Sequence, residues 1–264
     1  MVKMFLGLSK EDFNWIFFYL ILIICWFLVF IMGSYENQIN IFSNIYGKEF
    51  FLALCRTPAG FKDFHVIFLM WIIMGAAMMV PTFIPVLVTY KDLTYSKENK
   101  MYGFWILILG FLIVWILFAF FITSIQLLLL TQNILSANGT FLSPFLSSLL
   151  LSFAGIYQFS SLKNNCLKKC RSPMLFFMQY WNDNLISVFI IGFKVGIFCL
   201  GCCWLLMSLG FVGGSMNYFF MGLSTLMMTF EKLPRIGNFF NKFISLALLL
   251  SALYIISKEL TTIF

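Results

Sequence analysis

The sequence predicts an all-α, polytopic transmembrane helix bundle of about seven spans. Of its 264 residues, 62% are apolar and only 10% are charged, whereas soluble domains are about 45–50% apolar and about 25% charged. The apolar residues are gathered into long stretches that short polar segments separate. Because backbone groups inside lipid must be hydrogen-bonded within the chain, we expect these stretches to be helices.

The predicted spans follow one another along the whole chain. They cover residues 15–32, 64–90, 104–130, 141–159, 185–210, 211–230 and 239–256. Each approaches or exceeds the roughly 20 residues that cross about 30 Å of hydrocarbon. The hardest boundary lies inside 185–230, which is apolar throughout; Gly210, Gly213, Gly214 and Asn217 supply a turn that divides it. We expect residues 1–264 to form a single integral membrane domain.

The charge pattern orients this bundle. The chain carries 17 Lys and Arg against 10 Asp and Glu, and most of the cations fall in segments on the side of the N-terminus. The positive-inside rule therefore predicts a cytoplasmic N-terminus and, with seven spans, an external C-terminus. Cations that flank spans explain the net charge of +7, so we expect the lipid bilayer as a partner and no nucleic acid.

Cysteines form the first group of candidate functional residues. Cys166 and Cys170 lie in a segment that we expect to be a cytoplasmic loop. Cys199, Cys202 and Cys203 lie in the fifth span at the spacing i, i+3, i+4, which places them on one helix face. Thiolates are soft ligands that favour Cu(I), zinc or iron–sulfur clusters. Cys also packs well between helices as a small apolar residue, so packing is the alternative for the span cluster.

Methionines form the second group. Met70, Met74 and Met78 are spaced i, i+4, i+8 along the second span, and thioethers also suit Cu(I). The predicted topology places this stripe and the cysteines of the fifth span at a similar depth. His65, the chain's one histidine, precedes the stripe at the outer end of the span and could be a first ligand. The alternative for the stripe is a packing or lipid-facing surface, and for His65 an ordinary interfacial residue.

Two charged residues complete the candidate site. Lys194 lies within the fifth span, where an unpaired ammonium is costly unless it snorkels or pairs. Glu231, at the cytoplasmic end of the sixth span, is its expected partner. No Gly-x-Ser-x-Gly, His-Glu-x-x-His or P-loop motif is present in the sequence, so we assign no catalytic residue and do not expect an enzyme.

Several blocks of sequence resemble one bacterial family. They are Trp-Ile-Ile-Met-Gly-Ala-Ala-Met-Met-Val-Pro at 71–81, Cys-Leu-Lys-Lys-Cys-Arg-Ser-Pro at 166–173 with Tyr-Gln at 157–158, Gly-Ile-Phe-Cys-Leu-Gly-Cys-Cys-Trp-Leu-Leu-Met at 196–207, and Gly-Ser-Met-Asn at 214–217 with Glu-Lys at 231–232. This pattern is similar to the predicted metal-binding integral membrane proteins, catalogued as domain of unknown function 2182, over about 71–234. The resemblance implies metal binding, and some members are labelled copper chaperones. Where many members have Arg-His, this chain has Lys194-Val195 and thus lacks that histidine.

These observations predict a membrane protein that binds or passes a soft metal ion, Cu(I), through Met and Cys ligands. The outer set of ligands would be Met70, Met74 and Met78 with the cysteines of the fifth span, and the inner set would be Cys166 and Cys170. The resemblance places it in a bacterial inner membrane, with a membrane or periplasmic protein as partner. Two alternatives are a membrane thiol–disulfide redox protein and a structural or assembly subunit of a larger membrane complex.

Overall fold

The computed structural model describes residues 10–34, 64–94, 100–136, 139–180, 184–214, 217–233 and 236–263, and nearly all of them are helical. The helices are α1 (Lys10–Ser34), α3 (Phe64–Leu93), α4 (Lys100–Thr131), α5 (Pro144–Gln158), α6 (Ser161–Arg171), α7 (Pro173–Tyr180), α8 (Leu185–Ser208), α9 (Gly210–Gly213), α10 (Tyr218–Glu231) and α11 (Gly237–Ile263). The predicted all-α membrane bundle is therefore confirmed as a fold class.

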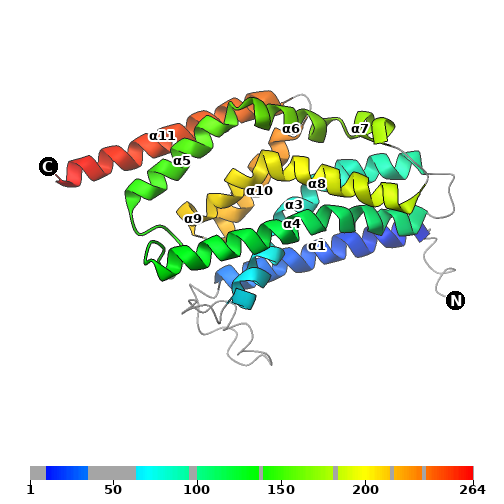
Figure 1. Cartoon of the computed structure of the whole chain (residues 1–264), viewed down its shortest axis with the longest axis horizontal. Coiled ribbons are helices and arrows are strands. Elements are labelled where there is room, and N and C mark those ends of the chain that lie inside the picture. Colours follow the sequence, from blue (N-terminus) through cyan, green and yellow to red (C-terminus); the bar gives the residue numbers. More distant parts are fainter. Residues whose placement is uncertain are drawn as a thin grey trace.

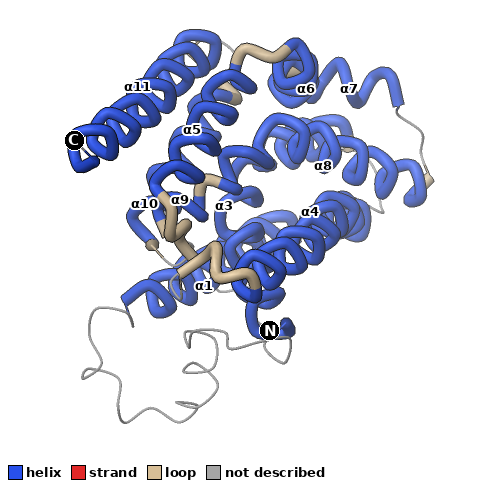
Figure 2. Tube along the Cα trace, turned by 60° about the vertical axis from the view of Figure 1, so that its left-hand side comes forward, coloured by secondary structure: helices blue, strands red, loops and turns tan. Residues whose placement is uncertain are grey.

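The long helices lie side by side along the long axis of the molecule (Figure 1). α1, α3, α4 and α8 form one layered group, and α5 packs against α11 beside it (Figures 1 and 2). α1 begins and α11 ends at opposite ends of this axis, as expected for chain ends on opposite sides of a membrane. Which end faces the cytoplasm remains a prediction.

Glycines bring α4 and α8 into close contact. A Cβ on Gly192 of α8 would lie 2.2 Å from the carbonyl oxygen of Leu107, and one on Gly110 of α4 would lie 2.4 Å from that of Phe189. Small residues let membrane helices approach at backbone distance and gain dispersion contacts that lipid cannot replace. This contact fixes the helix that carries the span cysteines against the centre of the bundle.

Fewer helices than the predicted seven are long and apolar enough to cross a membrane in the part of the chain that the structure describes. Among the described residues, five helices are long and apolar enough to span a membrane, within α1, α3, α4, α8 and α11. α5 and α6 would add a sixth crossing if the pair, bent by 61°, is one broken span. The predicted sixth span ends as α10, whose 14 residues extend only about 21 Å and cannot cross about 30 Å of hydrocarbon.

The turn that divides residues 185–230 is where the sequence predicted it. α8 ends at Ser208, the one-turn helix α9 follows, and Gly214 takes a φ of +93° that a side chain rarely adopts. The Asn217 side chain then caps α10 by accepting hydrogen bonds from the backbone N–H groups of Phe219 and Phe220 at 3.1 and 3.2 Å.

The segment after α5 is helical, whereas the sequence analysis expected a loop. Ser160 caps α6 by accepting a hydrogen bond from the N–H of Leu162. The cations in the last turn of α6 stabilise the helix, because they lie at the negative end of its dipole. Residues 161–171 and 173–180 are helical, and α6 packs along α8. This packing decides the geometry of the candidate site.

Candidate functional site

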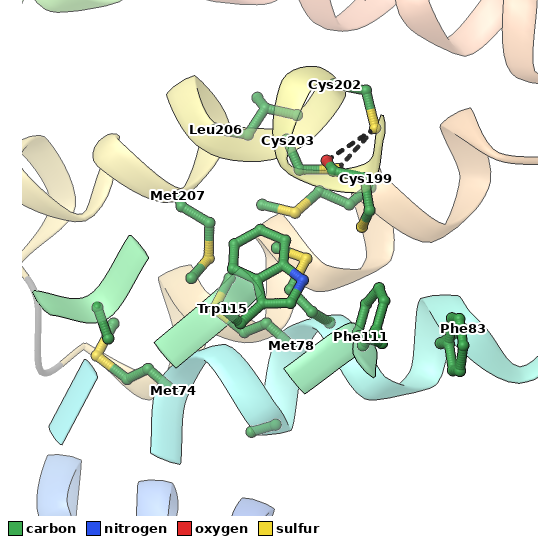
Figure 3. Close-up of a cluster of buried hydrophobic side chains, with 14 of the residues drawn as sticks. Met74, Met78, Phe83, Phe111, Trp115, Cys199, Cys202, Cys203, Leu206 and Met207 are labelled. Carbon is green, nitrogen blue, oxygen red and sulfur yellow. Dashed lines mark hydrogen bonds between the residues drawn. The ribbon is translucent and has the colours of Figure 1, made fainter. Parts of the chain in front are cut away.

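The centre of the candidate site is the cysteine face of α8. Cys199, Cys202 and Cys203 are all buried in the hydrophobic core, each at most 2% exposed. The Cys202 thiol donates a hydrogen bond to the Cys199 carbonyl oxygen at 3.1 Å, and its sulfur lies 3.3 Å from that of Cys203 (Figure 3). The predicted common face is therefore confirmed, and it points into the protein rather than toward lipid.

α6 brings two further thiols against α8, beside Gly201 and Cys202. A Cβ on Gly201 would lie 2.8 Å from the Cys166 sulfur, so Cys166 occupies the space that the glycine leaves on α8. Cys170, one turn later on α6, interacts with Cys202. The sequence analysis expected Cys166 and Cys170 in a loop, and this was wrong, because they lie on α6, a helix that packs along α8. Their assignment as a separate inner set of ligands stays a prediction.

The lysine that follows α10 reaches one of these sulfurs. Lys232 follows the last residue of α10, and its ammonium donates hydrogen bonds to the Cys199 sulfur at 3.0 Å and to the Thr82 hydroxyl at 2.7 Å. Thr82 of α3 in turn donates to the Met79 carbonyl oxygen at 2.7 Å. In the sequence, Lys232 ends an apolar segment and therefore looks like one of the solvated cations that flank a span.

A buried ion pair holds α6 and α10 together beside the thiols. The Lys163 ammonium lies 2.9 and 2.8 Å from the two carboxylate oxygens of Glu231, and the two side chains are 0% and 1% exposed. Lys163 also donates to the Gln158 side chain. Arg171 donates through Nε and an Nη to the Glu231 carbonyl oxygen at 2.9 and 2.7 Å, which satisfies the last turn of α10.

The expected partner of Glu231 was Lys194, and this pairing is wrong. Lys194 is half-buried on α8, and its ammonium lies 3.6 Å from the centre of the Tyr180 ring. A cation over an aromatic face is stabilised without a carboxylate. Lys194 therefore lies away from the thiol face, and Lys163 is the partner of Glu231 in its stead.

The methionines of α3 lie in the same buried cluster as the thiols. Met70, Met74 and Met78 are 2–3% exposed and belong to the core that contains the α8 cysteines. Figure 3 shows Met74 and Met78 on one side of the Trp115 ring and the cysteine face of α8 on the other, with Met207 close by. The predicted agreement in depth between the two sulfur sets thus corresponds to a shared core.

The structure adds sulfur atoms that sequence reasoning missed. Met207 of α8 and Met221 and Met228 of α10 are all buried in this core. Met207 follows Cys203 by one helical turn, a spacing that could have found it. His65 is not brought to the core; it is exposed at the start of α3, beside Phe64.

Comparison with known families bears on this cluster. The model of the copper chaperone family PpoB2 matches residues 68–255, a range that runs from α3 into α11 and includes every thiol described above. The chain belongs to this copper chaperone family. No curated protein and no solved structure matches the chain.

Membership of a copper chaperone family confirms the expected association with copper and with a metal-related family. The more specific family name from the sequence analysis remains a prediction. Copper would be the cargo of this protein, so the question for the site is which of its donors fit the ion.

The donors fit Cu(I) by type, since thiols and thioethers are soft and the core around them excludes water. Within the described residues, no group of three or more His, Cys, Asp or Glu side chains has the arrangement of a metal site. The Cys202 and Cys203 sulfurs approach each other, whereas the Cys199 sulfur accepts a hydrogen bond from Lys232. An ion bound to all three thiols would compete with Lys232 for the Cys199 sulfur.

Proposed function

We propose that this protein binds Cu(I) as cargo within the membrane at the thiols of Cys199, Cys202 and Cys203 and passes it on to an acceptor protein. One observation carries the proposal: the buried thiols of α8 and the half-buried thiols that α6 brings against the same helix lie together in a chain that belongs to a copper chaperone family. Thiols that only pack between helices have no need of a second helix that brings further thiols to them.

The donor types supply a route as well as a site. Thioethers bind Cu(I) weakly enough to release it, and thiolates hold it more firmly. Met70, Met74 and Met78 follow one another along α3 toward the thiols, and Met207 lies beside the thiols on α8. We propose that the ion moves along the thioethers to the thiols. Cys166 and Cys170 then serve as the exit ligands.

The acceptor and the location follow from this assignment. A copper chaperone delivers its ion to another protein, and the apolar outer surface of this bundle suits a membrane. The proposal places the chain in a bacterial inner membrane, with a membrane or periplasmic protein as the acceptor. Exposed aromatic side chains on that outer surface, such as Phe121 and Phe239 at 64% and 72% exposure, face the lipid in this arrangement.

The test compares copper stoichiometry between matched cysteine variants. The protein is purified in detergent under reducing, anaerobic conditions, loaded with Cu(I), and assayed by metal mass spectrometry. The wild type and a Cys25→Ser control, whose cysteine lies on α1 outside the thiol face, are expected to retain about one equivalent. The Cys199→Ser/Cys202→Ser/Cys203→Ser variant is expected to lose it, and full retention by this variant would refute the proposal.

A thiol–disulfide redox function is the second candidate, because the Cys202 and Cys203 sulfurs lie 3.3 Å apart. Two thiols would give two electrons and two protons to a disulfide oxidant and form one disulfide in exchange. Titration of the metal-free protein with a glutathione redox buffer, followed by alkylation and mass spectrometry, decides between the two. Reversible loss of two alkylation sites together with no Cu(I) uptake would favour redox chemistry.

A further inference from the structure

Packing alone does not explain the contact between Lys232 and Cys199, because apolar residues could pack the bundle at this place. An ammonium is costly to hold among buried apolar side chains unless a partner offsets its charge. Lys232 Nζ lies 3.0 Å from the Cys199 sulfur and 2.7 Å from the Thr82 oxygen. A hydroxyl is a neutral partner, so the sulfur is the group that can offset the positive charge.

The carboxylate next to Lys232 in the sequence is paired with another cation. The Glu231 carboxylate, one residue earlier, is held by the Lys163 ammonium through both of its oxygens. These two charges cancel each other. Arg171 donates hydrogen bonds to the Glu231 carbonyl oxygen and to the Asn238 side chain, and its charge also acts on Cys170 and Cys202. Lys232 is a cation that donates a hydrogen bond to a thiol sulfur of α8, so it places a positive charge in contact with the thiol face.

Softness alone does not make this face selective. Thiolates bind Cu(I), Ag(I), Zn(II) and Cd(II), so a cluster of cysteines accepts monovalent and divalent ions alike. A fixed positive charge changes this balance, because its repulsion of a divalent ion is twice that of a monovalent ion at the same distance. The low effective dielectric of a buried site strengthens the difference.

We infer that Lys232 is a specificity-determining residue that makes the thiol face select monovalent soft cations over divalent ones. The inference rests on the proposed function, since it requires that the thiol face binds Cu(I). In this role Lys232 does not coordinate the ion. The thiolates offset the positive charge of its ammonium together with that of the bound ion, so an ion with one positive charge is bound better than an ion with two.

The experiment compares Ag(I) with Cd(II), because both ions are thiophilic and they differ in charge. Binding of each ion to the purified protein in detergent is measured by competition against a chromophoric chelator. The variants are Lys232→Gln, which removes the charge and adds no sulfur ligand, and Lys232→Arg, which keeps the charge. Lys242→Gln, at an exposed position of α11, is the matched control.

In the wild type, Lys232→Arg and Lys242→Gln, Ag(I) is expected to bind much more tightly than Cd(II). In Lys232→Gln, the ratio of the Cd(II) to the Ag(I) dissociation constant is expected to fall by about tenfold or more. A purely structural role of Lys232 would weaken both ions together and leave this ratio unchanged, which would overturn the inference.

The wild type alone gives a second test of the inference, which does not require Lys232→Gln to fold. Equal affinity of the wild type for Ag(I) and Cd(II) would overturn the inference while the thiol site itself still stands. Loss of Ag(I) binding in the triple cysteine variant confirms that the thiols are the ligands being compared. If the wild type binds neither ion, the proposed function fails, and the specificity role of Lys232 fails with it.

Discussion

Replacement of Glu231 by Gln tests whether the buried ion pair holds the thiol site together. The change keeps the shape of the side chain and removes its charge. Lys163 is 0% exposed and lies 2.8 Å from a Glu231 oxygen, so Glu231→Gln leaves an ammonium buried with the Gln158 side chain as its remaining partner. α6, which carries Lys163, should then separate more readily from α10 and α8.

The magnitude follows from the burial of both partners. Removal of one member of a buried ion pair destabilises the structure by about 3–5 kcal/mol, because the other charge is left uncompensated. Since about 1.4 kcal/mol corresponds to a tenfold change in an equilibrium constant, the population with α6 displaced should rise by at least about 100-fold. Replacement of both partners by apolar residues should restore much of the loss.

Site-resolved alkylation measures this population. Cys202 is 2% exposed and faces Cys170 of α6, so its sulfur reacts when α6 moves away. The rate of Cys202 alkylation in Glu231→Gln should exceed that of the wild type by the same factor. A Lys163→Met/Glu231→Leu variant should react nearly as slowly as the wild type.

Asp92→Asn provides the matched control, because this carboxylate is exposed at the end of α3. It should leave the alkylation rate of Cys202 unchanged. If Glu231→Gln alters the rate no more than Asp92→Asn does, the ion pair does not hold α6 in place and the reasoning is refuted.

Two further predictions concern helix packing and the thioethers. Gly192→Leu should prevent close packing of α4 and α8 and yield aggregated protein on size-exclusion chromatography, because a Cβ there would lie 2.2 Å from a backbone oxygen; Gly75→Ala, with nothing within 4 Å of its Cβ, should behave as the wild type. A monodisperse Gly192→Leu protein would contradict the packing argument. Met207→Leu keeps the side-chain volume but removes a buried sulfur, so it should weaken Cu(I) binding by roughly tenfold at nearly unchanged stability. Met178→Leu, at a position 70% exposed on α7, should bind Cu(I) as the wild type does, and equal binding by the two variants would exclude Met207 from the route.

The helices themselves were predictable because their cause is local. A run of apolar residues about as long as the bilayer is thick forms a helix whatever surrounds it, since no other conformation satisfies its backbone in lipid. The turn after α8 was also readable, because Gly210 and the glycines that follow, with Asn217, are strong local signals. The i, i+3, i+4 spacing of the α8 cysteines fixed their common face in the same way.

The span count was harder because local composition does not show where a helix lies. α10 and α5 are apolar enough for spans but too short, at 14 and 15 residues. Their ends carry or adjoin polar residues, such as Glu231 and Gln158, which in the sequence look like the polar edges of full spans. Only the packed bundle shows that these ends are buried against each other.

The sequence by itself determined the class of this protein, its long helices, the cysteine face of α8 and the softness of its candidate ligands. The tertiary structure decided which partners those residues meet: α6 brings Cys166 and Cys170 to α8, Lys163 pairs with Glu231, and Lys232 reaches Cys199. The physical reason is that helix formation depends on neighbours along the chain. The partner of a buried charge or thiol depends on which distant helix packs against it, and a cation that ends an apolar segment has the same local sequence whether it is solvated or buried.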